Sequence, residues 1–478
     1  MKLCLLSGIS LVVSIYCLCV NTNDMYEYVF FLPLLYSVVS ALFFIGISSK
    51  RTYRLSLLYY FSNAVIFIRY VATPFFTVYS DGLIKWGWGP DPSSKVMLQA
   101  IVLMSIEEIT VFVTLYIAIR HYSRHTHALP QQRAIDARGE HIGIIGLYGV
   151  LAFLLTLAVK PVLVLPADVN SDNVQTVATR QAEDTAGSGI FVILGNTSKI
   201  VLFCVLLILC KRAYDRWRSG FFIFCAIVVV LVNVYFNISI TRIRMIFAAV
   251  IGLYFLSLLF KRIPKTAYIL AAIICIVGFI NISLFKFSYA LNGTNNIQLM
   301  TATMTAQFQD YFAGPRLVGQ MIDMHSTYHR QINLSTFFND FLGSVPFVSN
   351  YVDQTNRINY YFNSYNNINN STLIAPVLGT GYDYFPAFPF FFTIMFEFFV
   401  IKFDSLMIST SKISYRYLYA YMGFCCAMCM GYSTQNIFAV FASTFIPLLA
   451  LLKINDWIIL RFANTTYNPV RILNSSKV

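Results

Sequence analysis

Apolar runs, each about 20 residues long, recur along most of this chain. Of the 478 residues, 58% are hydrophobic and only 12% are charged, whereas a water-soluble domain carries roughly 25% charged residues. A run of this length is what an α-helix needs to cross the hydrocarbon core of a bilayer. The sequence therefore predicts an all-α, polytopic integral membrane protein.

We expect about twelve transmembrane helices. The first run could instead be a secretory signal peptide, but it is long and no clear small-residue cleavage site follows it, which favours a retained helix. No internal repeat is apparent. The predicted spans lie at about residues 3–20, 28–48, 55–79, 97–119, 142–166, 189–210, 220–237, 245–260, 266–286, 384–403, 417–432 and 437–453.

One long polar segment, residues 287–383, divides the chain into helices 1–9 (residues 1–286) and helices 10–12 with a tail (residues 384–478). The segment is rich in Asn and Tyr. Aromatic rings stack on sugar faces and amides bind hydroxyls, so this mixture suits sugar recognition. It equally suits an amphipathic domain that lies on a membrane surface.

Two stretches of the polar segment have helical spacing. Leu299–Met324 has a helical pattern that is broken at Gly314-Pro315. Ser335–Phe347 carries aromatic residues on one helical face, which predicts a helix lying flat on the membrane interface or, alternatively, a lid packed on the helix bundle. The segment is therefore predicted to contain short helices.

Positive charges indicate the orientation. With the N-terminus inside, 22 of the 34 Lys and Arg residues fall in inner segments, nine fall in outer segments, and Arg69, Lys160 and Lys199 fall within spans. This bias places both termini in the cytoplasm and the polar segment outside, as one large extracytoplasmic loop. Because the positive charge of the chain is spread over short connections, it indicates topology and does not indicate nucleic-acid binding.

The ten cysteines lie mainly in apolar runs, and none lies in the polar segment. This excludes a disulfide framework there. The cluster Cys425-Cys426-Ala427-Met428-Cys429 is too apolar for a metal site and predicts core packing. We therefore expect neither a metal nor a cofactor.

Several ionisable residues fall inside predicted spans. Each costs at least roughly 2.5–3.5 kcal/mol to insert, so such residues are kept for pairing or for function. Lys199 and the pair Glu107 and Glu108 lie at similar depths, which predicts a Glu–Lys pair between the fourth and sixth spans. Glu397 in the tenth span has no evident partner.

An unusual group of outer cations lies near the seventh and eighth spans. Arg242 and Arg244 sit in the very short connection between them, and Arg69 is expected at a nearby depth. Arg binds phosphate oxygens in pairs, so a pyrophosphate at the outer leaflet is one ligand for such a cluster. Pairing with acidic residues of the outer connections is the alternative.

In four features the chain resembles the bacterial O-antigen and capsule repeat-unit polymerases of the Wzy type. These are the twelve-span layout with one large outer loop before the last three spans, the outer Arg cluster followed by an apolar helix with Gly252, the segment Gln309–Arg316, and the segment Pro376–Pro386. The layout covers most of the chain, and the motifs are short.

The resemblance implies a metal-independent glycosyl transfer at the outer face of the bacterial plasma membrane. A growing glycan on undecaprenyl pyrophosphate would be the donor, and a repeat unit on the same lipid would be the acceptor. A flippase and a chain-length regulator would act as partners.

Such a reaction needs a base for the attacking hydroxyl, cations for the leaving pyrophosphate, and a groove for sugars. The catalytic candidates are Asp310, His325 and Arg316, with Glu108 as a further possible base. The candidates for binding pyrophosphate and sugar are Arg69, Arg242, Arg244, Arg330 and Arg357.

Three other functions compete. A lipid-linked oligosaccharide flippase also needs internal cations, but it predicts short loops and two similar halves. A lipid-dependent glycosyltransferase with its base in the first outer connection, Asn21–Glu27, would have a small catalytic loop. An O-antigen ligase would share the chemistry of the polymerase.

Overall fold

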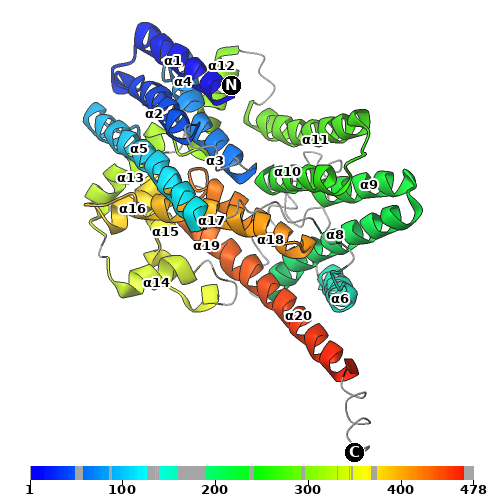
Figure 1. Cartoon of the computed structure of the whole chain (residues 1–478). Coiled ribbons are helices and arrows are strands. Elements are labelled where there is room, and N and C mark those ends of the chain that lie inside the picture. Colours follow the sequence, from blue (N-terminus) through cyan, green and yellow to red (C-terminus); the bar gives the residue numbers. More distant parts are fainter. Residues whose placement is uncertain are drawn as a thin grey trace, which may run out of the picture. The chain divides into compact units, whose positions relative to one another are not determined.

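The computed structural model describes residues 2–48, 57–84, 89–125, 135, 137, 139–159, 189–235, 242–291, 297–330, 332–343, 345, 348–367 and 374–467. Throughout these residues the regular structure is helical, and none of them forms a strand (Figure 1). The all-α class predicted from the sequence is confirmed.

Contacts between residues divide the chain into two compact units. The first contains Met1–Gln131, Leu284–Leu406 and Met422–Val440. The second contains Gln132–Ser283, Met407–Tyr421 and Phe441–Val478. The polar segment, residues 287–383, thus belongs entirely to the first unit.

In the first unit, the N-terminal helices pack on one another and on α5, and the polar segment adds a series of shorter helices. Its elements are α1 (Lys2–Val20), η1 (Asp24–Tyr26), α2 (Phe31–Ser48), α3 (Leu57–Phe67), the π-helical turn η2 (Ile68–Ala72), α4 (Thr73–Tyr79), α5 (Ser94–His125), α12 (Ile297–Tyr311), α13 (Pro315–Tyr328), α14 (Leu334–Leu342), η4 (Val348–Tyr351), η5 (Gln354–Asn356), α15 (Ile358–Tyr365), α16 (Val377–Tyr384), α17 (Phe391–Ser409) and α19 (Thr434–Val440).

In the second unit, α6, α8, α9 and α10 pack in order, each against the next, and the C-terminal helix packs on α6 and α8. The elements are α6 (Gly143–Val159), α8 (Gly189–Trp217), α9 (Phe221–Tyr235), α10 (Arg242–Leu259), α11 (Lys265–Leu291), α18 (Ile413–Ala427), the π-helical turn η6 (Phe441–Phe445) and α20 (Ile446–Tyr467). The ends of α11, α17 and α18 extend beyond the unit that holds most of each helix.

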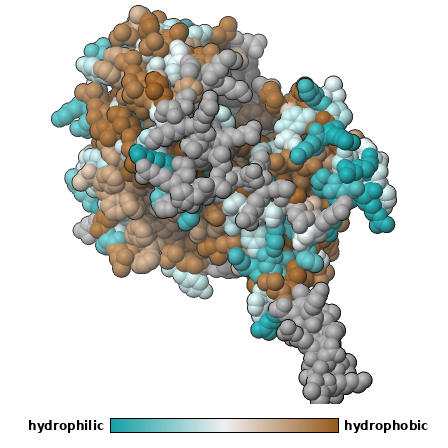
Figure 2. Space-filling model, viewed as in Figure 1, coloured by the Kyte–Doolittle hydropathy of each residue, from teal (hydrophilic) through white to brown (hydrophobic). Residues whose placement is uncertain are grey.

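Five helical stretches in the described part of the chain are long and apolar enough to cross a membrane: Asp24–Gly46, Leu57–Tyr79, Ser94–Tyr122, Ile193–Trp217 and Thr434–Arg461. Five shorter apolar helices accompany them. Large apolar side chains also cover much of the surface (Figure 2). In α1, for example, Leu5 and Val12 are 65% and 67% exposed. Such faces suit lipid and support the prediction of a membrane protein.

Most predicted spans coincide with a helix, but the tenth begins later than expected. The sequence places its start at residue 384, whereas α17 begins at Phe391. Tyr384 ends the separate helix α16, and Pro386 and Pro389 occupy the connection between the two helices. Proline lacks the amide proton that a continuous helix needs, so the chain turns there.

The polar segment has a small core of its own. Leu317, Met321 and Met324 lie on one face of α13 and pack against Ile358 and Phe362 of α15. The spacing of the three α13 residues is that of adjacent turns of a helix. Figure 1 shows α13, α15 and α16 gathered beside α5, in agreement with their contacts. This bears out the expectation that the segment contains short helices.

Helix α14 packs on the bundle of the first unit. Phe341 is buried, and its ring lies 5.6 Å from Phe392 of α17 and 4.9 Å from Phe438 of α19. Leu334 and Phe338 remain exposed. The contacts of α14 are therefore those of a lid packed on the bundle, which is the second of the two predicted placements. One of its faces is exposed.

Candidate functional site

The segment Gln309–Arg316 forms the tight turn between α12 and α13. Ala313 adopts a left-handed conformation with φ of 47°, and Pro315 begins α13, where its missing amide proton costs nothing. The Gln309 side chain accepts from the Arg316 amide at 3.2 Å and donates to Thr77 at 2.8 Å. The turn is thereby tied to α4, which gives this polar motif a structural role.

Asp310 is a carboxyl group with no hydrogen-bond partner among the described residues, and it is only partly accessible. Burial raises its pKa from 3.8 to about 7, although the positive charge of Arg316 acts in the opposite direction. A carboxyl with such a pKa can exchange protons near neutral pH, as a general base must. Asp310 therefore stays a candidate.

Arg316 is held by the segment that precedes α5. Its Nε donates to Asp91 at 2.7 Å, and its Nη2 donates to the carbonyl oxygen of Gly89 at 3.1 Å. The side chain is nearly buried, whereas Asp91 is well exposed. Arg316 thus fastens α13 to residues 89–91, and these contacts favour a positioning role.

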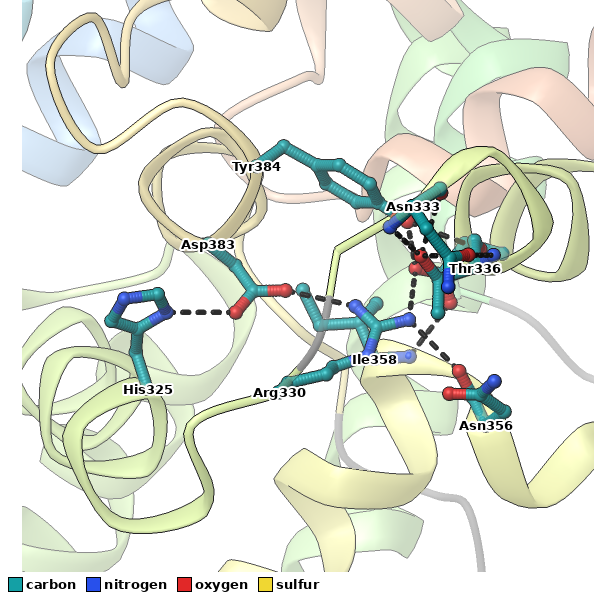
Figure 3. Close-up of polar contacts among 9 residues, drawn as sticks. His325, Arg330, Asn333, Thr336, Asn356, Ile358, Asp383 and Tyr384 are labelled. Atoms are coloured by element: carbon teal, nitrogen blue, oxygen red, sulfur yellow. Dashed lines mark hydrogen bonds and ion pairs between the residues drawn. The ribbon is translucent and has the colours of Figure 1, made fainter.

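The most organised polar site of the segment joins α13, α14, α15 and α16 (Figure 3). At its centre lies the carboxylate of Asp383, which is fully buried. One oxygen lies 3.0 Å from Nδ1 of His325, and the other accepts from Arg330 at 2.8 Å. The imidazole of His325 keeps 28% of its side-chain surface exposed. The site therefore presents a partly exposed histidine that is anchored by a buried acid.

Arg330 binds two buried carboxylates at once. Besides Asp383, its Nη2 donates to Asp340 at 2.7 Å and to the carbonyl oxygen of Asn356 at 2.8 Å. The rings of Tyr361 and Tyr384 lie within 5.5 and 5.7 Å of its guanidinium carbon. The neighbouring carboxylates raise the pKa of Arg330 above its usual value, so it stays charged. A guanidinium that is held by two carboxylates positions other groups.

Asp340 is the second acid of this network. Its Oδ1 accepts from the Ile358 amide at 2.7 Å, which caps the start of α15, and its Oδ2 also accepts from the Tyr384 hydroxyl. Burial raises the pKa of Asp340, while Arg330 opposes that shift. Burial and the adjacent carboxylate together raise the pKa of Tyr384. The network thereby binds α14, α15 and α16 into one unit.

The glycines of the segment Pro376–Pro386 allow α16 to approach its neighbours. A Cβ at Gly379 would lie 2.5 Å from Cγ of Met321, and one at Gly381 would lie 1.9 Å from the carbonyl oxygen of Pro389. The second contact is with backbone, which cannot give way. The small glycines let α16 pack closely, and this packing places Asp383 beside α13.

The structure brings some predicted site residues together and separates others. His325 and Arg330 share one network through Asp383, whereas Arg316 lies nine residues before His325 on α13, on the opposite face of the helix, since nine residues turn it by about 180°. Arg357 donates to Gln354 at 2.7 Å, and burial lowers its pKa.

The predicted cations of the apolar helices have different surroundings. Arg69 is fully buried in the first unit, and its Nη2 lies 2.8 Å from Glu107, which also accepts from Tyr70 and Thr393. Glu107 is thus engaged with Arg69 of its own unit, whereas the sequence predicts that Glu107 or Glu108 pairs with Lys199. Arg244 of the second unit donates to Asn196 at 3.4 Å. The side chain of Arg242 lies outside the described residues.

Sequence reasoning missed Asp383, Asp340 and Tyr384 as members of the site. Asp383 did carry a signal, because it is an acid in an aromatic stretch directly before an apolar run. Such an acid is expected to be buried and therefore to have a charged partner. Which partner it has depends on tertiary contacts.

No protein-family model, curated protein or solved structure matches the chain.

Proposed function

We propose that this protein is a glycosyltransferase of the bacterial plasma membrane that polymerises oligosaccharide repeat units, carried on undecaprenyl pyrophosphate, into O-antigen or capsular polysaccharide. Its helices would cross the membrane about twelve times, with both termini in the cytoplasm and residues 287–383 on the outer face. The apolar helices, the charge bias and the resemblance described above support this proposal.

The observation that carries the proposal is the pairing of His325 with Asp383. With a proton on Nδ1, the imidazole donates to Asp383, and Nε2 is then free to accept a proton from a substrate. The partial exposure of His325 leaves the ring accessible. A buried carboxylate that orients a histidine is one arrangement that general-base catalysis uses.

In the proposed reaction, the acceptor hydroxyl loses its proton to Nε2 of His325 as its oxygen attacks the anomeric carbon of the donor. The new carbon–oxygen bond joins the two glycans, and the bond from that carbon to the lipid pyrophosphate breaks. The pyrophosphate departs with the bonding electrons. Asp310 is the second candidate for the base, because burial brings its pKa close to neutrality.

Cations near the reacting carbon would offset the charge that develops on the leaving pyrophosphate. Arg69, Arg316 and Arg330 are each held by a carboxylate, which favours roles in positioning. In the first unit, Arg357 is the remaining candidate for contact with the pyrophosphate, and Arg242 and Arg244 stay candidates that the sequence predicts. The aromatic and amide side chains of the polar segment would hold the sugars. Neither a metal nor a cofactor takes part.

Deletion of the gene in its host, followed by gel analysis of surface glycan, tests the proposal. Loss of a polymerase leaves single repeat units on the surface. Loss of a flippase or of a ligase leaves none, and either result would contradict the proposal. The flippase and the chain-length regulator are the expected partners in the same pathway.

A further inference from the structure

A small hollow that continues to the outside lies among four helices of the second unit. Three of these helices each contribute two or three residues from adjacent turns, and α9 contributes a single residue. The lining residues are Asn196, Lys199 and Ile200 of α8, Asn233 of α9, Arg244 and Ala248 of α10, and Tyr417 and Tyr421 of α18.

The charges that line this hollow have one sign. Lys199 and Arg244 bring two cations to it, and none of the eight lining residues is acidic. An anion that enters the hollow would be attracted by both cations.

Asn233 supplies an independent indication of a ligand. Its side chain is 96% buried in apolar helix α9, and neither its amide nitrogen nor its amide oxygen has a hydrogen-bond partner among the described residues. A buried polar group left without a partner costs about 1–3 kcal/mol, so native proteins rarely keep one unless something binds it. Because Asn233 lines the hollow, its amide nitrogen is placed to donate to whatever occupies it.

We infer that this hollow binds a phosphate-type oxyanion. Lys199 and Arg244 would supply the charge, and Asn233 and the hydroxyls of Tyr417 and Tyr421 would donate hydrogen bonds. A tetrahedral oxyanion has several oxygens and can accept from donors on four helices at once. The inference concerns binding and does not depend on the proposed reaction, so either can fail without the other.

The phosphate can belong to a lipid headgroup or be free in solution, and two arms of one experiment distinguish these sources. In the first arm, the full-length protein in detergent is dialysed against radiolabelled inorganic phosphate. In the second, the protein is reconstituted in phosphatidylcholine nanodiscs with or without phosphatidic acid, extracted, and the retained lipid is counted by mass spectrometry. We expect saturable binding in at least one arm.

Lys199→Met should weaken this binding about tenfold or more, because a charged hydrogen bond is lost. Lys211→Met is the matched control: it removes a cation from the same helix, where Lys211 pairs with Asp215 and does not line the hollow. Asn233→Leu should weaken binding and also raise the thermal midpoint, since it removes the buried amide. Absence of binding in both arms would overturn the inference, as would equal affinities of the Lys199 and Lys211 variants or an unchanged affinity of the Asn233 variant.

Discussion

Nδ1 of His325 lies 3.0 Å from Oδ1 of Asp383, and these residues are 58 positions apart in the chain. The other oxygen of the carboxylate is taken by Arg330 at 2.8 Å (Figure 3). This double engagement holds the acid in one orientation and leaves the imidazole as the accessible end of the network.

Asp383→Asn should lower kcat about 10²–10⁴-fold and leave KM nearly unchanged, because an amide can neither fix the imidazole tautomer nor stabilise its charge. Steady-state kinetics of chain extension would measure both constants. Asp91→Asn, which alters the exposed acid beside Arg316, is the control and should keep most of the activity. An unchanged kcat of the Asp383→Asn variant would show that Asp383 has no role in the mechanism.

Asp310→Asn should make the protein more stable in a pH-dependent way. The pKa of Asp310 is raised from 3.8 to about 7 in the folded state, so between these values the folded protein binds more protons than the unfolded chain. The stability of the wild-type protein is therefore reduced as pH rises through this window, and an amide escapes that loss. The difference in Tm between variant and wild type should grow from about pH 4 to about pH 7 and then level off. A difference that stays constant with pH would contradict the environment assigned to this carboxyl.

The buried pair Arg69–Glu107 should show strong coupling. Arg69→Met leaves a buried carboxylate without its guanidinium, which costs about 3–5 kcal/mol of stability. Glu107→Gln in turn leaves the buried guanidinium without its carboxylate. The double variant removes both charges and should recover much of the loss. The stability of each variant would be measured as the fraction of protein that stays monodisperse after heating in detergent. Lys95→Met, on the exposed start of α5, is the control. If the stability losses of the two single variants add up in the double variant, the two residues are not energetically coupled.

Topology is a separate prediction. A reporter that is active only outside the cytoplasm should work when fused at Asn339, in the polar segment. A reporter that is active only inside should work at Gly139, in a segment rich in positive charge. An inactive fusion at Asn339 would contradict both the orientation and the proposed reaction.

The sequence predicts the helices of this protein well because the transfer of the apolar runs out of water determines where they form. The apolar run at residues 189–210 became α8, and the break at Gly314-Pro315 became the start of α13. Periodicity and depth do not determine which helices are neighbours. Depth predicts that Glu107 or Glu108 pairs with Lys199, whereas the fold pairs Glu107 with Arg69. Contacts such as that between Arg330 and Asp383 depend on how the short helices pack, which spacing along the chain does not encode.

Chain extension in vitro, with purified protein, lipid-linked repeat units and excess chelator, tests whether His325 is the base of a metal-independent glycosyl transfer. The wild-type protein should produce a ladder of longer glycans. His325→Ala should reduce the rate about 10²–10⁴-fold. His329→Ala, at the exposed end of the same helix, should extend chains normally. No ladder from the wild-type protein under these conditions, or full activity of His325→Ala, would contradict the account.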